Sequence, residues 1–328
     1  GKQVQLPLTS RTIPIVGDPI LVDREFGTGA VKITPAHDFN DFEAGNRNGL
    51  KRVKILDLHA HLRLAGSVAD PAVAEALENL PVAKARPKVE QFLTDQGFLE
   101  KPEPHKLALG KCYRCKTVVE PFLSDQWFVK IKPLAEPAIQ VVEDGRVRII
   151  PEAWKNNYLG WMRDIKDWCV SRQIWWGHQI PAWYCETCSG TPFLRRSSDG
   201  APLIPSDAVA IVAKTKPDAC PQGHRDALVQ DPDVLDTWFS SGLWPFSTLG
   251  WPGHQDAALK EFYPGAVLVT AFDIIFFWVA RMMMMGLHFM KKVPFRTVLL
   301  HALVVDENGE KMSKVKGNVL DPLHLIHG

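Results

Sequence analysis

The chain has 328 residues, which is long enough for two or three domains that each bury a core of their own. Hydrophobic residues make up 46% and charged residues 23%, the balance of an ordinary soluble globular protein. The net charge of +1 argues against nucleic-acid binding through bulk charge, although a local basic stripe would not show in this total. The most apolar stretch, 265–290, contains Asp273, Arg281 and His288, so it fits a buried strand and helix better than a membrane span.

Residues 1–125 are expected to form a compact α+β unit. Alternating or β-branched runs predict strands at 12–16, 20–22 and 30–34, the last one following a turn at 27–29. Asp38 is placed to cap a short helix that ends at Gly45. Further helices are predicted at 71–80, with Asp70 as the cap and a proline at the first helical position, and at 89–96.

The next segment, 126–180, is rich in tryptophan and is interpreted as a connection that returns to a larger domain. Aromatic side chains carry a large apolar area, so the simplest role for this cluster is packing between domains. Its members are Trp127, Trp154, Trp161, Trp168, Trp175 and Trp176.

Residues 181–232 form a small insertion that resembles a zinc ribbon. No segment resembles a secretory signal, so the cysteine pairs favour metal ligation over disulfides. Cys185, Cys188, Cys220 and His224 have the residue types that tetrahedral Zn²⁺ prefers, and an excursion with little apolar content needs such a staple. The alternative is a loop with free thiols. Cys112 and Cys115 form a second pair, with His105 as the nearest further ligand, and Cys169 is expected to be a buried thiol.

Residues 233–328 carry the alternation of strands and helices that is typical of a βαβ unit. A strand is predicted at 266–270, an apolar helix at 274–290, a strand at 297–301 and a turn at Asn308–Gly309. The methionine run 282–285 is interpreted as core filling on that helix.

The most specific signal is the run Lys311-Met312-Ser313-Lys314-Val315, followed by Lys316-Gly317-Asn318-Val319 and Asp321-Pro322. It resembles the KMSKS loop of the class I aminoacyl-tRNA synthetases. A solvated lysine-rich loop would leave the order of Met, Ser, Gly and Asn unexplained. The chemistry agrees, because expulsion of pyrophosphate from ATP needs mobile cations near the leaving group.

Four longer blocks resemble the valine-specific members of that family in particular. They cover 27–38, 171–178, 233–242 and 272–281, and they occur in the order that the family has. The resemblance implies the C-terminal half of a Rossmann-like α/β catalytic domain, with part of an inserted editing domain. Isoleucyl- and leucyl-type enzymes share the plan and remain the alternative within the family.

The resemblance also implies roles for particular residues in amino-acid activation. Asp273, just beyond the end of a strand, would bind the ammonium group of valine, and the pocket wall would come from Ile274, Trp278 and Trp238. Asp273 could instead be a helix N-cap, or serve in both ways. Lys314 would bind the ATP phosphates, with Lys311 and Ser313 as partners in the loop.

A pocket for an isopropyl group cannot strongly reject threonine, which is nearly isosteric, so the family adds a hydrolytic editing site. Carried over by resemblance, Asp41 would hold the ammonium group of the mischarged threonine. Lys32 and Thr34 would contact its polar side or the end of the tRNA, and Phe26 would contribute to the pocket. The alternative for Asp41 is an exposed carboxylate at the start of a helix.

The sequence departs from the family pattern in several ways. The His-x-Gly-His element, the threonine-rich editing strand and the anticodon-binding domain are absent, so the chain is expected to be an internal fragment that aminoacylates nothing alone. Val315 replaces a serine and Ala271 replaces a glycine, and a methyl group at Ala271 would tighten the site if the position needs a positive φ.

These expectations describe a cytoplasmic, monomeric parent protein that ligates valine to tRNA(Val) with ATP and Mg²⁺, with a structural Zn²⁺ and no membrane. Two other classes of function stay open: a trans-acting deacylase or interaction module that keeps the editing segment, and a zinc-ribbon nucleic-acid binder.

Overall fold

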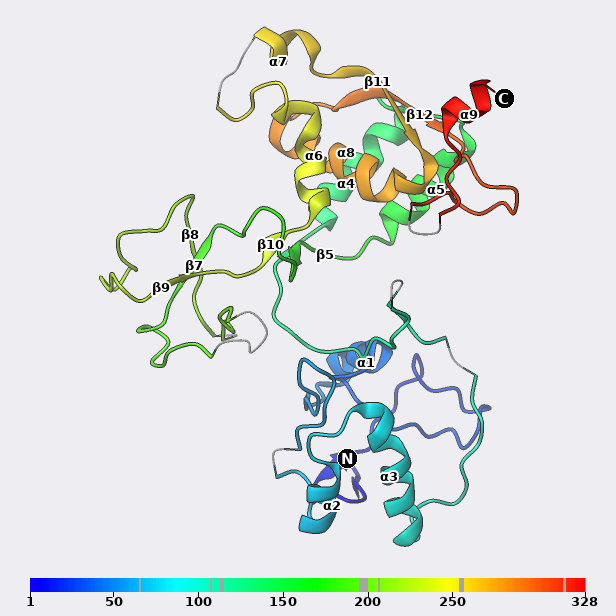
Figure 1. Ribbon diagram of the computed structural model, residues 1–328, viewed down its shortest axis with the longest axis vertical. Helices are drawn as coiled ribbons and strands as arrows, with labels where there is room; N and C mark the ends of the chain where they lie inside the picture. Colours follow the sequence, from blue (N-terminus) through cyan, green and yellow to red (C-terminus); the bar gives the residue numbers. More distant parts are fainter. Residues whose placement is uncertain are drawn as a thin grey trace. The chain divides into compact units, whose positions relative to one another are not determined.

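The chain divides into two compact units, Gly1–Ser124 and Asp125–Gly328. A computed structural model describes residues 1–64, 66–106, 108–112, 115–194, 200–205, 207–253, 257–314 and 317–327. In Figure 1 the first unit is coloured from blue to cyan and the second from green to red.

The first unit combines a small antiparallel sheet with three helices. Strands β1 (Gln3–Gln5) and β2 (Thr12–Pro14) pair with each other, and the helices are α1 (Phe39–Asn48), α2 (Pro71–Leu77) and α3 (Val82–Asp95). Its core is a small cluster that α2 and α3 help to cover, made of Leu62, Leu64, Val73, Leu77 and Ala85.

Two of the strands predicted for this unit are wrong. Residues 20–22 form a turn, because the carboxylate of Asp18 accepts hydrogen bonds from the backbone N–H groups of Ile20 and Leu21, both at 3.1 Å. Such a local bond competes with a β ladder. Residues 30–34 pair with no strand in the described part of the chain, and the N–H of Thr34 donates to the carboxylate of Asp41 at 2.7 Å.

Two of the three predicted helix starts are confirmed in this unit, whereas the third start and the helix ends are less accurate. Asp38 and Asp70 cap α1 and α2 as expected. Helix α1 continues through Gly45 to Gly49, whose φ of 62° ends it. Gly45 stays helical because it packs on Pro35, where a Cβ at position 45 would lie 2.8 Å from the proline Cβ. Helix α3 begins seven residues before its predicted start and contains Pro87.

A three-stranded parallel sheet in the order β11-β12-β4 organises the second unit. Strand β11 (Gly265–Ala271) pairs with β12 (Phe295–His301), and β12 pairs with β4 (Arg148–Ile150). The predicted strands 266–270 and 297–301 are thereby confirmed. Strand β4 belongs to the tryptophan-rich segment, which therefore supplies part of the sheet together with helices α4 (Lys132–Glu143) and α5 (Ala153–Arg163).

The apolar helix of the second unit runs from Phe272 to Met290 and changes its winding along the way. It starts as a 3-10 turn, widens to π turns at Ile275–Val279 and Gly286–Met290, and is α-helical at α8 (Ala280–Met285). By length and composition it would pass as one membrane span. Its buried face explains the apolarity, because α8 packs against α4 and α6 (Thr237–Ser247), and the four methionines of α8 are at most 4% exposed. The interpretation of the methionine run as core filling is confirmed.

The tryptophans mostly pack within the second unit. Trp154 stacks on Phe272 with ring centroids 5.0 Å apart, and Trp161 stacks on Phe276 at 4.8 Å, which attaches α5 to the 272–290 helix. Trp175 and Trp176 differ, since they are 95% and 89% exposed.

One face of the parallel sheet is not covered within the described residues. Its exposed apolar side chains are Val267, Val269, Leu299 and Ile150, between 40% and 57% exposed. Parallel sheets are normally covered on both faces.

The remaining strands form a lobe of the second unit and its attachment. Strands β7 (Ala182–Cys185), β8 (Ile211–Val212) and β9 (Leu228–Gln230) make an antiparallel sheet in the order β8-β7-β9. Two short antiparallel pairs precede the main sheet: β3 (Phe128–Val129) with β5 (Trp168–Cys169), and β6 (Ser171–Arg172) with β10 (Val234–Leu235). Short helices α7 (Ala257–Phe262) and α9 (Pro322–His327) complete the unit.

Candidate functional site

An open cavity of about 440 Å³ lies between α6 and the start of the 272–290 helix. Three residues predicted to wall a pocket, Trp238, Ile274 and Trp278, line it together. Trp238 also stacks on Phe277 with ring centroids 5.9 Å apart. The remaining lining residues all belong to α6 and are Ser240, Ser241, Trp244 and Ser247.

The sequence reasoning missed this face of α6. Ser241, Trp244 and Ser247 recur every third residue, so they fall on one side of a helix. This three-residue spacing is visible in the sequence of the 233–242 block and its continuation. It indicates a cavity wall only once Ile274 and Trp278 are known to lie opposite.

Asp273 lies two residues beyond the end of β11, at the carboxyl edge of the sheet. The side chain is about one quarter exposed and forms an ion pair with the ammonium group of Lys311. Asp273 is not a helix cap, because the 3-10 turn that contains it starts at Phe272 after Ala271, with no side-chain cap. The cap alternative is therefore wrong, and the carboxylate contacts Lys311 of the 311–314 loop.

The loop that carries Lys311 is held by two polar side chains. The carboxylate of Asp306 accepts from the backbone N–H groups of Asn308 and Glu310, at 3.0 and 2.8 Å, and so closes the predicted turn. Asn318 accepts from the N–H of Ser313 at 2.8 Å and donates to Asp306 at 2.7 Å.

The other loop residues are placed less close to Asp273. Lys314 is exposed and lies in a turn, and within the part of the chain that the structure describes it neither bonds to Asp273 nor lines the cavity. Val315 and Lys316 lie outside the described residues. Ala271 has a φ of −75°, so the condition under which its methyl group would strain or tighten the backbone is not met.

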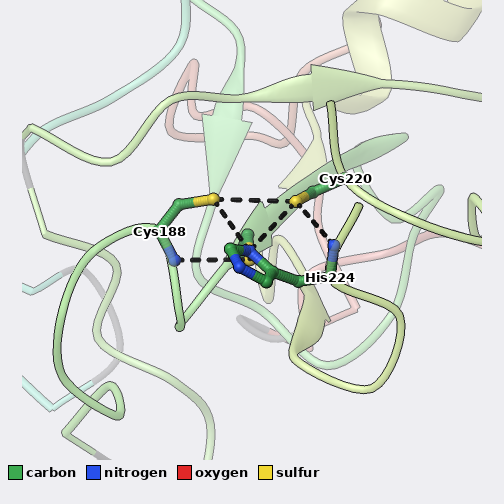
Figure 2. A group of neighbouring side chains, drawn as sticks. Cys188, Cys220 and His224 are labelled. Atoms are coloured by element: carbon green, nitrogen blue, oxygen red, sulfur yellow. Dashed lines mark hydrogen bonds between the residues drawn. The ribbon is translucent and has the colours of Figure 1, made fainter. Parts of the chain in front are cut away.

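The four predicted metal ligands lie together in the small lobe (Figure 2). Nδ1 of His224 is 3.5, 3.3 and 3.4 Å from the sulfurs of Cys185, Cys188 and Cys220, and the sulfurs of Cys188 and Cys220 are 3.6 Å apart. A tetrahedral zinc ion with ordinary bond lengths requires about 3.6 Å between sulfur and nitrogen and about 3.8 Å between sulfurs. The donor set fits such an ion.

Electrostatics in this cluster favour a cation. Burial raises the pKa of Cys220, but backbone N–H groups of His224 and Gln222 and the neighbouring thiols outweigh it and lower the pKa to about 6. The neighbouring Cys185 sulfur and burial raise the pKa of Cys188 to about 12. A divalent cation bound at this cluster would favour the thiolate form of its cysteines.

The first unit brings together three of its four candidate residues. Oδ2 of Asp41 accepts from the N–H of Thr34, and the ammonium group of Lys32 contacts the hydroxyl of Thr34. Asp41 is half-buried in the first turn of α1, so it is neither simply exposed nor free of a structural role. Phe26 is 70% exposed and its ring meets the edge of His105 at 6.5 Å.

The second cysteine pair has no complete ligand set among the residues that the structure describes. The thiol of Cys115 donates to Thr117 at 3.2 Å. As donors to the thiolate form, the hydroxyl and backbone N–H of Thr117 lower the pKa of Cys115 to about 7. His105, considered as a third ligand, packs against Phe26. Cys169 is half-buried, somewhat more open than predicted.

Comparison with known proteins identifies the family. Residues 33–328 match the family model for tRNA synthetases class I (I, L, M and V). The valine--tRNA ligase of Geobacter sulfurreducens is 54% identical over 99% of this chain and 34% of its own length. Those of Solibacter usitatus and Carboxydothermus hydrogenoformans are 52% and 51% identical over 98% and 100% of this chain, again with 34% of their own lengths covered.

The chain thus spans about a third of the length of these curated relatives. The resemblance drawn from the KMSKS-like loop and the four longer blocks is confirmed. Because the family model matches residues 33–328, far more than half of the sequence, the chain belongs to the class I tRNA synthetases.

Proposed function

We propose that this chain is part of a valine--tRNA ligase, which activates valine with ATP and transfers it to tRNA(Val). The observation that carries the proposal is the meeting of Asp273 and Lys311 at the carboxyl edge of the sheet, beside a cavity walled by Trp238 and Trp278. Open α/β sheets bind ligands at this edge.

The residues of the cavity suit the parts of a free amino acid. Asp273 supplies one negative charge for the substrate ammonium group, and Ile274 with the two tryptophans supplies apolar surface for the isopropyl group. The cavity is larger than valine requires, so we propose that a part of the parent protein outside this chain completes its wall.

The lysine loop would act in the activation step. An oxygen of the valine carboxylate attacks the α-phosphate of ATP, pyrophosphate leaves with the bonding electrons, and valyl-adenylate forms. The ribose hydroxyl at the 3′ end of tRNA(Val) then attacks the carbonyl carbon, and AMP leaves. Lys311 and Lys314 would stabilise the charge that builds on the pyrophosphate, Ser313 would orient the loop, and Mg²⁺ would accompany ATP.

Pyrophosphate exchange tests the proposal directly. The full-length protein is expected to exchange pyrophosphate into ATP with valine and at least about 10-fold less efficiently with isoleucine, because an added methylene is costly in a fitted pocket. Equal or better exchange with isoleucine or leucine would assign the chain to another specificity of the family.

The isolated 328-residue chain is expected to show no exchange. Its sheet has an exposed apolar face, and its relatives are about three times longer, so half of the nucleotide-binding fold is proposed to lie elsewhere in the parent. Robust turnover by the isolated chain would refute the fragment interpretation.

We further propose a structural Zn²⁺ bound by Cys185, Cys188, Cys220 and Nδ1 of His224. Bound there, zinc would supply folding free energy to a lobe whose own apolar core is small. The lobe would belong to a cytoplasmic, monomeric parent protein, and a nucleic-acid-binding role for it is not favoured by the near-neutral charge.

For the first unit we propose part of an editing domain that hydrolyses threonyl-tRNA(Val). Support comes from the grouping of Lys32, Thr34 and Asp41. Asp41 would bind the ammonium group of the mischarged threonine, and Phe26 would contact its surroundings. Water would be the nucleophile.

Mischarged threonyl-tRNA(Val) distinguishes the remaining alternatives. The full-length protein is expected to deacylate it, and Asp41→Ala is expected to slow that hydrolysis by at least about 10-fold, since a charged hydrogen bond is lost. The isolated chain should leave it intact. Rapid hydrolysis by the isolated chain would favour the trans-acting deacylase.

A further inference from the structure

We infer that Asp236 is a positioning residue for the amino-acid cavity, fixing the first turn of α6 and with it the wall residue Trp238. The inference rests on the proposed function, in which that cavity receives the substrate side chain. Asp236 is not itself in the lining of the cavity.

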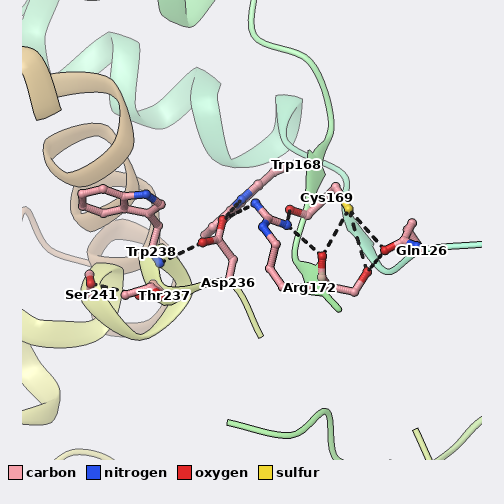
Figure 3. A network of polar contacts seen from close by, with 9 residues as sticks. Gln126, Trp168, Cys169, Arg172, Asp236, Thr237, Trp238 and Ser241 are labelled. Atoms are coloured by element: carbon pink, nitrogen blue, oxygen red, sulfur yellow. Dashed lines mark hydrogen bonds and ion pairs between the residues drawn. The ribbon is translucent and has the colours of Figure 1, made fainter. Parts of the chain in front are cut away.

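Asp236 is 6% exposed and its carboxylate joins three segments of the chain (Figure 3). Oδ2 accepts from the indole N–H of Trp168 at 3.0 Å and from Nη2 of Arg172 at 2.8 Å. Oδ1 accepts from the backbone N–H of Trp238 at 3.2 Å, which caps α6. The N–H of Asp236 also donates to the carbonyl oxygen of Val170 at 2.7 Å, so both backbone and side chain are anchored.

A second guanidinium group, that of Arg281 on α8, packs on the Trp168 ring that donates to Asp236. Arg281 is 7% exposed, and its guanidinium carbon lies 4.1 Å from the ring centroid of Trp168 and 5.6 Å from that of Trp161. Its Nη1 has no hydrogen-bond partner within the described residues. Burial lowers the pKa of Arg281 to about 10, and the charge of Asp236 acts in the opposite direction. Asp236 thus supplies negative charge to two cations, one bonded directly and one through the intervening indole.

The other acidic caps in the chain lack these features. Asp38 and Asp70 are exposed, and the hydrogen bonds to their carboxylates come from backbone N–H groups of their own helices. A cap of that kind stabilises a helix start but does not connect it to other elements. Asp236 does both, because its side-chain donors come from β5 and β6.

The anchored turn leads straight into the cavity. Trp238 follows Asp236 by two residues and lines the cavity with Ser241, one turn further along α6. The next contact of the helix is tight as well, since a Cβ at Gly242 would lie 3.3 Å from Cγ of Met285 and 3.4 Å from Cβ of Arg281. A displacement of the first turn of α6 at Asp236 is therefore expected to move Trp238 in the cavity wall, while the helix stays packed on α8 at Gly242.

The experiment compares Asp236→Asn with Asp231→Asn in the full-length protein. Asp231 is a matched control: it is 5% exposed and accepts from the indole N–H of Trp127 and the hydroxyl of Tyr184, and within the described residues its side chain bonds to none of the residues that line the cavity. Asp236→Asn leaves the shape of the side chain but puts an amide where Arg172 and Trp168 need an acceptor.

We expect Asp236→Asn to raise the KM for valine in pyrophosphate exchange about 10- to 100-fold with kcat within about threefold, because the wall contacts the side chain and not the reacting atoms. The preference for valine over isoleucine should fall as well. Asp231→Asn should leave both quantities within about twofold. Arg172→Lys keeps the charge but loses the fork geometry, and should raise the KM by a smaller factor of about 3 to 10.

Hydrogen exchange gives a readout that does not depend on activity. Amides at the start of α6 should exchange faster in Asp236→Asn, while those of β11 and β12 stay unchanged. If the wild-type protein does not exchange pyrophosphate with valine, the proposed function fails and hydrogen exchange alone decides the inference. The inference would be overturned if Asp236→Asn left both the KM for valine and amide hydrogen exchange in α6 unchanged. It would also be overturned if Asp231→Asn changed these two quantities as much as Asp236→Asn does. Should Asp236→Asn fail to fold, Arg172→Lys provides the same comparison.

Discussion

The two units assemble their candidate sites in different ways. In the second unit, Trp238, Asp273 and Lys311 come from a helix, a strand end and a loop that are far apart in the sequence, and a large core holds those elements. In the first unit, Lys32, Thr34 and Asp41 belong to one short stretch with no strand pairing to support it. A site built from distant segments forms only when the whole unit folds. A site within one short stretch can form without the rest of the unit.

The largest expected effect on pyrophosphate exchange separates the two candidate carboxylates, Asp273 and Asp41. Asp273→Asn in the full-length protein should lower kcat/KM for pyrophosphate exchange at least about 100-fold, because removing one partner of a desolvated charge pair costs about 3 kcal/mol. Asp41→Asn should leave exchange within about twofold. Glu261→Gln, an exposed acid on α7, is the charge-matched control. A comparable loss in Asp41→Asn would abolish the distinction between the units.

A metal measurement tests whether the small lobe, unlike the large core that holds the cavity, depends on a bound ion for its stability. Cys188→Ser should lower the zinc content by about one equivalent per chain, since tetrahedral structural sites need all four ligands. Local unfolding of the lobe should follow, seen as faster amide exchange in β7 and β9. Cys169→Ser should keep the metal. Full zinc content in Cys188→Ser would show that the cluster is not the binding site.

Acid should affect the first unit through Asp18. Burial raises its pKa, but hydrogen bonds from the N–H of Leu21, from Arg47 and from Asn48 outweigh this and hold the pKa below its ordinary value of 3.8. A lowered carboxyl pKa stabilises the folded state above pH 3.8, and the contribution is lost as the pH falls through the folded pKa.

Asp18→Asn should therefore lower the melting temperature of the first unit at pH 7. Its difference from wild type should shrink below about pH 3.8. Melting curves between pH 7 and pH 3 measure this. A constant difference across that range would contradict a charge-dependent role.

The smallest effects come from one glycine in each unit. Gly45→Ala should destabilise the first unit by about 1–3 kcal/mol, because the new methyl group would meet Pro35 at 2.8 Å. Gly160→Ala should stabilise the second by about 0.5–1 kcal/mol, since the position is helical and open. Denaturant unfolding of each variant gives both values, and opposite signs are required.

Local chemistry predicted some elements well and others poorly. Asp38 and Asp70 correctly predicted the starts of α1 and α2. The patterns at 266–270 and 297–301 correctly predicted two strands of the sheet. Residues 20–22 look equally strand-like, but the side chain of Asp18 takes their N–H groups. Strand β4 was missed because three residues carry little periodic signal and its pairing with β12 is decided far away in the sequence.

The candidate sites show the same limit. Asp273, Trp238 and the four metal ligands could be named from motifs, because their residue types and spacing are characteristic of the chemistry. The network around Asp236 could not, since the pairing of Asp236 with Arg172 and Trp168 arises only after strands β5 and β6 reach the start of α6. Buried polar connections of this kind leave no periodic trace.

The ion pair between Lys311 and Asp273 has a consequence for the order of events. If Asp273 binds the ammonium group of valine, as proposed, then Lys311 and valine compete for the same carboxylate. Binding of valine would then displace the ammonium group of Lys311 from Asp273, and that group could bind phosphate instead. Binding of valine would thus make the ammonium group of Lys311 available to the phosphates of ATP.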